Sequence, residues 1–373
     1  MTVKPDLTMS ERFLSKTAFG AIFGLLEKRG YQVIGPTIDQ GAIIYDHIRC
    51  IDDLPRGWTD EQSPGQYRLK QRDDDALFGY VVGPHSWKQY LFPPQSILSQ
   101  ADKTETGWQF RTTEEEPPKY AILGVRACEL AAMRVQDRVF LSGPYVDPIY
   151  QRRRTEAFII AVNCTQAAST CFCTSMNTGP ECTTGFDMAL TELNDGFVIS
   201  AATPKGSDIL AALETTEANV ENVESAQIAR QRAVDQIERR MDTTDIRDLL
   251  QSNLEHPRWD DVGTRCLSCT NCTMVCPTCF CSSVQEVSDL TGEHVERQRQ
   301  WDSCFNFDFS YMNGGNVRDN VRSRYRQWLT HKLSSWIDQF DTSGCVGCGR
   351  CITWCPVEID LTEEVAAIRG EPS

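Results

Sequence analysis

The sequence predicts a chain in two parts: an α+β or α/β domain over residues 1–240, with a cysteine-rich segment at 164–182, and a mainly helical domain over residues 241–373. Three observations predict this division. Short apolar segments alternate with helical patterns through the first part. A charged helical pattern over residues 226–254 leads into the second part. Eight of the 17 cysteines gather there in two short groups.

The first part is predicted to begin with an amphipathic helix over residues 10–29, which Ser10 caps and Gly30 ends. A second helix is expected over residues 129–140. The predicted strands are short apolar or alternating segments bounded by turn residues. They cover residues 31–34, 42–48, 67–71, 77–82, 119–123 and 158–162.

Each cysteine group has the spacing C-x2-C-x2-C-x3-C and is followed by proline. The groups are Cys266, Cys269, Cys272 and Cys276, and then Cys345, Cys348, Cys351 and Cys355. This run is the bacterial ferredoxin signature for 4Fe–4S ligation, and thiolate is a soft ligand that suits such a cluster. Two copies predict two 4Fe–4S clusters in a ferredoxin-type dicluster domain, and hence electron transfer.

In two-cluster ferredoxins the cysteine before proline ligates the other cluster. The predicted ligands are Cys266, Cys269, Cys272 and Cys355 for cluster 1, and Cys345, Cys348, Cys351 and Cys276 for cluster 2. The 68 residues between the motifs exceed the spacer of a compact ferredoxin, so we expect an insert with helices over 284–297 and 318–338. Zinc is the alternative metal, although structural zinc sites usually separate two cysteine pairs by a longer loop.

A second signal is the repeat of Thr-Cys-Phe-Cys at residues 170–173 and 278–281. One interpretation is a third iron–sulfur cluster held by Cys171, Cys173, Cys182 and either Cys128 or Cys164. Another is a sulfur-handling or extra cluster site made by Cys279, Cys281 and Cys304. The alternative for all of them, and the one favoured for Cys50, is a buried thiol that packs as a small apolar group. We expect the repeat to mark where the first domain meets the clusters.

The segment between the two motifs is locally basic: it contains Arg297, Arg299, Arg318, Arg322, Arg324, Arg326, His331 and Lys332. Positive charge near a cluster raises its reduction potential, so these residues are candidates for counter-charge or for docking an acidic partner. A solvated helix face is the alternative.

Composition and missing motifs exclude several classes of function. The net charge of −15 disfavours nucleic acid as a partner. Residues 1–12 lack the apolar core of a signal peptide, and the longest aliphatic run, 157–162, is far shorter than the ~18 residues of a membrane span. We therefore expect a cytoplasmic protein whose thiols serve metals. No dinucleotide- or ATP-binding glycine motif occurs, which favours a partner that holds any dinucleotide.

The chain resembles a known family over roughly residues 119–360. In the first part the matching motifs are Gly-Val-Arg-Ala-Cys128, Asp-Arg-Val-Phe140, Asn-Cys164, Thr-Cys-Phe-Cys173, Gly-Pro180 and Gly-Phe-Asp187. In the second part they are Cys-Pro-Thr-Cys-Phe-Cys281, Trp-Asp-Ser-Cys304, Gly-Gly315 and Cys-Val-Gly-Cys-Gly-Arg-Cys351. These motifs resemble the β (iron–sulfur) subunit of cytosolic sulfhydrogenases, which are NAD(P)-linked NiFe hydrogenases, and the related A subunit of anaerobic sulfite reductase.

The resemblance implies a non-catalytic electron-transfer subunit of an oxidoreductase complex. Its implied partners are a flavin subunit with an NAD(P) site and the large and small subunits of a NiFe hydrogenase, or else sulfite reductase subunits. The alternative function is that of a sulfite or sulfur reductase subunit with a cysteine-based sulfur site.

Overall fold

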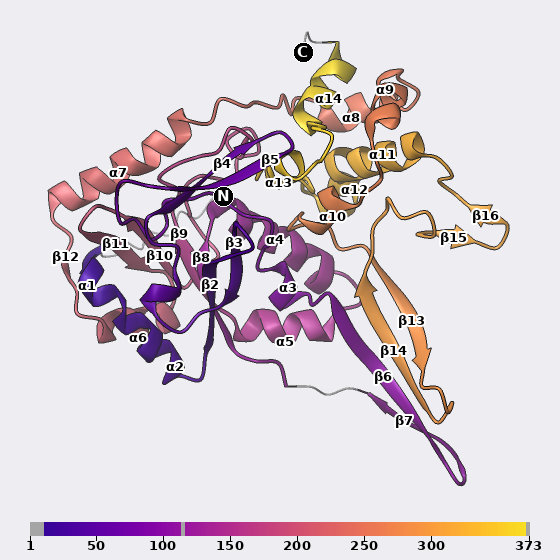
Figure 1. The fold of residues 1–373 in the computed structure, drawn as a ribbon, viewed down its shortest axis with the longest axis horizontal. Helices are drawn as coiled ribbons and strands as arrows, with labels where there is room; N and C mark the ends of the chain where they lie inside the picture. Colours follow the sequence, from indigo (N-terminus) through magenta and orange to yellow (C-terminus); the bar gives the residue numbers. More distant parts are fainter. Residues whose placement is uncertain (1–10, 113–115, 371–373) are drawn as a thin grey trace.

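The computed structural model describes residues 11–112 and 116–370. The first part of the chain forms a mixed eight-stranded sheet flanked by helices (Figure 1). The strand order is β12 (Thr216–Glu217), β1 (Arg12–Ser15), β11 (Gly196–Ala201), β10 (Met188–Glu192), β9 (Phe158–Val162), β8 (Tyr120–Val125), β2 (Gln32–Asp39) and β3 (Ala42–His47). The central neighbours β10, β9, β8 and β2 run parallel, and the outer pairs are antiparallel. The expected α/β character of this part is confirmed.

Strand β9 shows how the sequence builds this layer. All five residues of Phe158–Val162 are buried, as in a sheet covered on both faces. Ile159 and Ala161 join one hydrophobic core, and Phe158, Ile160 and Val162 join the other, because successive side chains of a strand alternate. The first core lies under α4 (Ala127–Leu141) and α5 (Pro148–Glu156). The second lies under α1 (Lys16–Phe19), α2 (Ala21–Glu27) and α6 (Pro204–Ala212).

The second part of the chain is mainly helical, as expected. Its helices are α8 (Ile246–Ser252), α9 (Arg258–Arg265), α10 (Asn271–Met274), α11 (Val321–Thr330), α12 (Trp336–Phe340), α13 (Arg350–Thr353) and α14 (Leu361–Arg369). A π-helical turn, His331–Ser335, joins α11 to α12. A third core fills this region, and Trp259, Tyr325 and Trp328 are among its largest members. Helix α7 (Val220–Asp235) and the segment after it connect the two parts (Figure 1).

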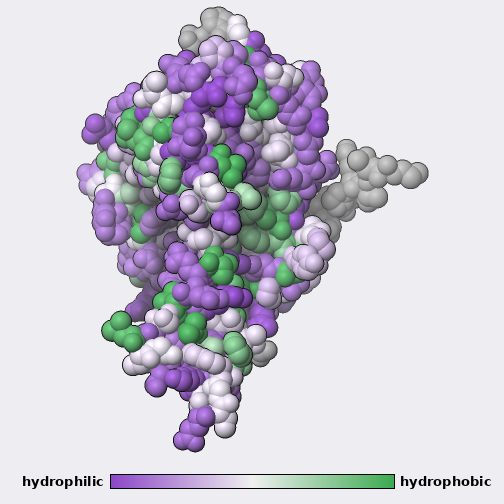
Figure 2. Space-filling view, turned by 90° about the vertical axis from the view of Figure 1, so that its right-hand side faces the viewer, coloured by the Kyte–Doolittle hydropathy of each residue, from purple (hydrophilic) through white to green (hydrophobic). Residues whose placement is uncertain are grey.

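The helix expected over residues 284–297 is wrong. The segment is a hairpin of β13 (Ser282–Ser288) and β14 (His294–Trp301), and β14 pairs with β6 (Gln95–Thr104), which pairs with β7 (Gly107–Thr112). The ladder with β6 supplies hydrogen-bond partners that no local pattern reveals. The four strands extend away from the body (Figure 1), and Figure 2 shows hydrophobic residues among hydrophilic ones at this lower end. Two small hairpins complete the strands: β4 (Trp58–Ser63) with β5 (Gln66–Gln71), and β15 (Tyr311–Met312) with β16 (Gly315–Asn316).

Other expectations need correction. The helix predicted over residues 10–29 begins as strand β1, and its proposed cap, Ser10, lies outside the described residues. Ser15 caps α1 instead, since its Oγ accepts a hydrogen bond from the Ala18 N–H at 3.3 Å. The helical pattern over 226–254 is interrupted between α7 and α8.

The strand predicted over residues 77–82 is an irregular segment. Carboxylates replace a strand partner there: Glu192 accepts from the backbone N–H groups of Leu77 and Phe78, both at 2.7 Å. Asp60 accepts in the same way from Val81 at 2.7 Å. The remaining short helix, α3 (Lys88–Leu91), follows this segment. Within the described residues, no helix is both long enough and apolar enough to cross a bilayer.

Candidate iron–sulfur sites

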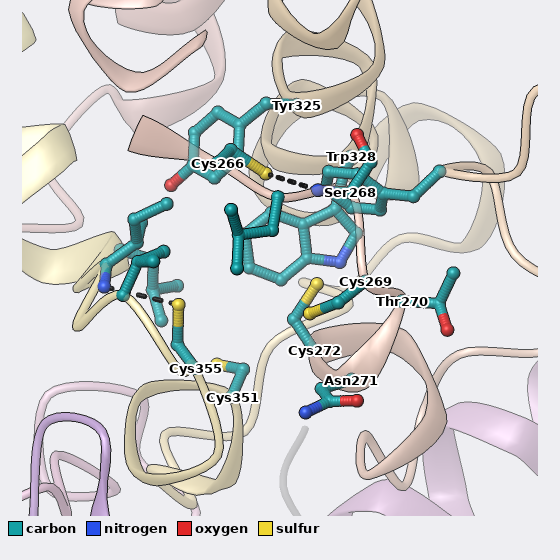
Figure 3. Close-up of a pocket in the computed structure, with 15 residues that line it drawn as sticks. Cys266, Ser268, Cys269, Thr270, Asn271, Cys272, Tyr325, Trp328, Cys351 and Cys355 are labelled. Atoms are coloured by element: carbon teal, nitrogen blue, oxygen red, sulfur yellow. Dashed lines mark hydrogen bonds between the residues drawn. The ribbon is translucent and has the colours of Figure 1, made fainter. Parts of the chain in front are cut away.

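The four cysteines predicted to hold cluster 1 lie around one pocket (Figure 3). Aromatic and aliphatic side chains of the third core line the rest of the pocket. The lining cysteines are Cys266, Cys269, Cys272 and Cys355, with Cys351 beside them. The C-x2-C-x2-C loop turns sharply because Ser268 and Thr270 adopt left-handed backbone conformations, with φ of 51° and 69°.

Backbone groups of this pocket point at sulfur. The Sγ of Cys266 accepts from the Ser268 N–H at 3.4 Å, and the Sγ of Cys355 accepts from the Ile359 N–H at 3.3 Å. Hydrogen bonds to sulfur stabilise the thiolate, which is the form that binds iron. The donor set and its surroundings therefore fit an iron–sulfur cluster.

The second predicted set is buried more deeply. Burial raises the pKa of the Cys351 thiol, and the nearby sulfurs of Cys345, Cys348 and Cys276 raise it further. The same causes, led by burial, raise the pKa of Cys345 to about 12, although Lys332 opposes them. These pKa shifts would leave Cys345, Cys348 and Cys351 neutral on their own, whereas a hydrogen bond from Cys279 and the ammonium of Lys332 hold the pKa of Cys276 well below its usual range. A bound metal deprotonates coordinating thiols outright, so the set fits a cluster.

These sulfur sets are not arranged around single ions. Among the described residues, no three His, Cys, Asp or Glu side chains converge as ligands of one metal ion. In a 4Fe–4S cluster each thiolate binds a different iron atom, so its ligands stand farther apart than those of one zinc ion.

The loop of the second set is held by close backbone contact. Gly347 and Gly349 have φ of 64° and 77°, and a Cβ at Gly349 would lie 2.4 Å from the Thr170 carbonyl oxygen. The Phe172 N–H donates to the Gly347 carbonyl at 2.9 Å. On the other side of the loop, the Thr278 hydroxyl donates to the Gly344 carbonyl at 2.6 Å. Both Thr-Cys-Phe-Cys segments thus contact the same loop, a relation that the repeat alone did not predict.

The cysteines proposed for a third cluster also lie near one another. Burial raises the pKa of Cys173, and Cys171, Cys164 and Cys348 add to the shift. Burial likewise raises the pKa of Cys128, and the sulfurs of Cys348 and Cys173 raise it further. Cys182 is buried, and Cys164 is the neighbouring sulfur that raises its pKa most. Cys128, Cys171 and Cys173 therefore lie near Cys348, Cys182 lies near Cys164, and Cys128 and Cys164 both lie close to Cys173.

A buried ion pair joins this group to the second motif. Arg350, between Cys348 and Cys351, donates to the Glu129 carboxylate at 2.5 Å, and both side chains are fully buried. Arg350 also donates to the Gly83 carbonyl at 2.8 Å. Glu129 follows Cys128 in the first turn of α4, so the pair fixes that helix against the cysteine loop.

Two lysines belong to the site, and sequence reasoning missed one of them, Lys88. Lys332 lies on the π-helical turn, and its Nζ is 3.2 Å from the Cys276 Sγ and 3.2 Å from the Gly344 oxygen. The Lys88 Nζ donates to the carbonyls of Cys276 and Cys279 at 3.0 and 3.2 Å. The basic segment pointed to Lys332 only as one of several cations. Nothing in the sequence distinguished Lys88.

Most arginines of the basic segment serve other partners. Arg322 and Arg326 both pair with Glu255 at 2.8 Å, and Arg297 pairs with Glu286 at 2.5 Å. Cys50 is exposed, so its interpretation as a buried thiol is wrong.

Comparison with known proteins agrees with this geometry. Residues 265–359 match the family model described as a 4Fe–4S dicluster domain, which implies two 4Fe–4S clusters. The chain is 27% identical to sulfhydrogenase 2 subunit beta of Pyrococcus furiosus over 357 residues, which cover 94% of this chain and 96% of the relative. No solved structure matches the chain significantly.

Proposed function

We propose that this chain is the electron-transfer subunit of a multisubunit, cytoplasmic hydrogenase or sulfhydrogenase. It would relay electrons between a flavin subunit with an NAD(P) site and a NiFe hydrogenase module, without a substrate site of its own. The similarity to a sulfhydrogenase β subunit along nearly the whole chain supports a role within a complex.

We assign cluster 1 to Cys266, Cys269, Cys272 and Cys355, and cluster 2 to Cys276, Cys345, Cys348 and Cys351. When bound, each 4Fe–4S cluster takes up and releases one electron. The chain itself contributes buried thiolates, N–H groups that point at sulfur and the ammonium of Lys332. We also propose that residues 1–240 form the α/β domain and that residues 241–373 form the domain that binds clusters 1 and 2.

A third cluster is assigned to Cys171, Cys173 and Cys182 with Cys128 or Cys164 as the fourth ligand. Asn163 supports this group, because its Oδ1 accepts from the Cys182 N–H at 2.7 Å. Its Nδ2 donates to the Thr191 hydroxyl on β10 at 2.9 Å, which anchors the loop to the sheet.

The observation that carries the proposal is the continuity of the three sulfur sets. Cys351 lines the first pocket and is also close to Cys345, while Cys348 is close to Cys128 and Cys173. At the other end Cys269 is exposed. A continuous series of thiols that reaches the surface is what a relay between two partner subunits requires.

The test combines composition with partner dependence. Isolated anaerobically, the chain should contain about eight irons from the dicluster domain, or about twelve with the third set. NADH or NADPH should reduce these centres, followed by EPR, only when a flavoprotein partner is added. Efficient NAD(P)H oxidation by the isolated chain would contradict the proposal, and so would zinc without iron and labile sulfide.

A further inference from the structure

Three cysteines outside the assigned sets meet at the base of the β13–β14 hairpin. The last rung of the hairpin pairs Ser282 with Trp301. Cys281 directly precedes this rung, and its carbonyl accepts from the Asp302 N–H at 2.9 Å, which continues the pairing. The hairpin thereby brings Cys281 close to Cys304, although the two residues lie 23 positions apart in the sequence.

Two of the three thiols contact each other. Cys304 donates a hydrogen bond to Cys281, which lowers the pKa of Cys281 to about 7. Cys279 lies on the Lys332 side of the group, with its Sγ 3.6 Å from the ammonium nitrogen. All three residues are partly buried. Two separate segments after the first motif thus bring three thiols near one another.

Two buried lysines lie beside this group. Lys88 is 2% exposed and Lys332 is 3% exposed. Within the described residues, neither lysine forms an ion pair with an aspartate or glutamate. The Lys88 Nζ lies 4.0 Å from the centre of the Trp301 ring, and its other contacts include the Cys276 and Cys279 carbonyls.

This arrangement favours negative charge nearby. A buried ammonium without an anion costs several kcal/mol, and burial accordingly lowers the pKa of Lys88, while the sulfurs of Cys279 and Cys276 oppose that shift. Lys332 has an anionic partner in Cys276, a proposed ligand of cluster 2. Lys88 contacts carbonyls and a ring, and the sulfur with the largest electrostatic effect on it is that of Cys279. Thiols that only fill space would give the Lys88 ammonium no anion, whereas thiolates that bind a cluster would.

The repeat points to the same chemistry. The Thr-Cys-Phe-Cys segment at 170–173 supplies two cysteines to the set assigned to a third cluster, and it bonds to the cysteine loop at Gly347. The segment at 278–281 clamps the Gly344 side and supplies Cys279 and Cys281. Each copy therefore places two thiols beside the second motif.

We propose that Cys279, Cys281 and Cys304 hold an additional iron–sulfur centre, whose charge Lys88 and Lys332 balance. This inference rests on the proposed function, because it places the centre beside cluster 2. Three thiolates leave one coordination position for a ligand from solution, since Cys276 is assigned to cluster 2.

The test is a Cys281→Ala/Cys304→Ala double variant, compared with wild type and with Cys50→Ser, which replaces an exposed thiol. After anaerobic reconstitution with iron and sulfide, the double variant should bind two to four fewer irons per chain, according to cluster type. Its reduced EPR spectrum should lose one component, and the components assigned to the dicluster cysteines should remain. The Cys50→Ser variant should match wild type.

Equal iron and sulfide contents in wild type and double variant, with identical EPR spectra, would overturn the proposal. Failure of the proposed function looks different, because the isolated wild-type chain would then oxidise NAD(P)H efficiently or would contain zinc without iron and labile sulfide. If the double variant does not fold, Lys88→Met provides a second measurement. This variant should shift the midpoint potential of the additional component more than the midpoint potential of cluster 1. The cluster 1 component is identified as the one that a Cys266→Ala variant loses. An equal shift of both potentials would also overturn the inference.

Discussion

At the scale of single residues, Lys332 is the clearest case of a side chain whose role follows from its surroundings. Its ammonium is buried, lies 3.2 Å from the Cys276 sulfur and is carried by a π-helical turn. Such turns occur frequently at functional sites. A fixed positive charge beside a ligand sulfur favours the more negative, reduced state of a cluster.

We therefore expect Lys332→Met to lower the midpoint potential of cluster 2. A unit charge at this range in a protein of effective dielectric constant about 20 is worth about 2–4 kcal/mol, or on the order of 100 mV. An EPR-monitored redox titration measures the shift, with Lys205→Met at an exposed position as the control. Unchanged potentials in Lys332→Met would show that the lysine only packs.

The Arg350–Glu129 pair gives a prediction about stability. Arg350→Met leaves the Glu129 carboxylate buried without its cation, which typically costs about 3–5 kcal/mol. Thermal unfolding of the anaerobic holo-protein should show a clearly lower midpoint. Arg111→Met, which removes an exposed ion pair with Asp102, should have little effect. The double variant Arg350→Met/Glu129→Met should recover part of the loss, and a double variant as unstable as the single one would contradict the explanation.

At the scale of elements, the cysteine loop depends on glycines that permit close contact. A Cβ at Gly349 would lie within 2.4–2.8 Å of Thr170 atoms, and the φ of 77° adds strain. Gly292 has a similar φ of 67° but open space around it, so a substitution there tests backbone strain without steric contact.

Gly292→Ala should therefore cost about 1–2 kcal/mol and leave the iron content unchanged. Gly349→Ala should cost more and reduce iron and sulfide content, because the loop must move away from the Thr170–Cys173 segment. Urea unfolding and iron analysis of both variants measure this. Equal effects would mean that the contact is unimportant.

The elements also show what the sequence could predict. Strand β9 lies exactly where its apolar run predicts, because a central strand buried on both faces has an unambiguous pattern. The dicluster cysteines were predictable because ligand spacing is local. The strands β13 and β14 were not, because their stability comes from pairing with β6 about 200 residues earlier. Lys88 was missed for the same reason: its contacts at Cys276 and Cys279 lie 188 and 191 residues away.

At the scale of the whole molecule, the three hydrophobic cores differ in their dependence on metal. The core under α1, α2 and α6 contains no cysteine among its described members. The core of the helical region packs against six: Cys266, Cys272, Cys304, Cys345, Cys351 and Cys355. Metal binding contributes to folding free energy where the ligands are part of the core.

Removal of iron with a chelator should therefore destabilise the three cores unequally. Amide hydrogen exchange should accelerate strongly in α8 and α11 and remain slow in α2 and β11, because the core to which α2 and β11 contribute loses no bound centre. Mass spectrometry of exchange resolves these segments. A uniform acceleration along the chain would contradict the division into metal-dependent and metal-independent cores.

The pairing of β14 with β6 also affects folding during synthesis of the protein. Gln95 on β6 bonds to Gln298 on β14, 203 residues later in the chain. At about 5–20 residues per second, the ribosome needs roughly 10–40 s to deliver the second strand after the first. During that interval one edge of β6 is an open template for strands of other nascent chains. Two factors would then influence how much of the protein aggregates: chaperone binding to this edge, and the rate of translation, which sets the length of the interval.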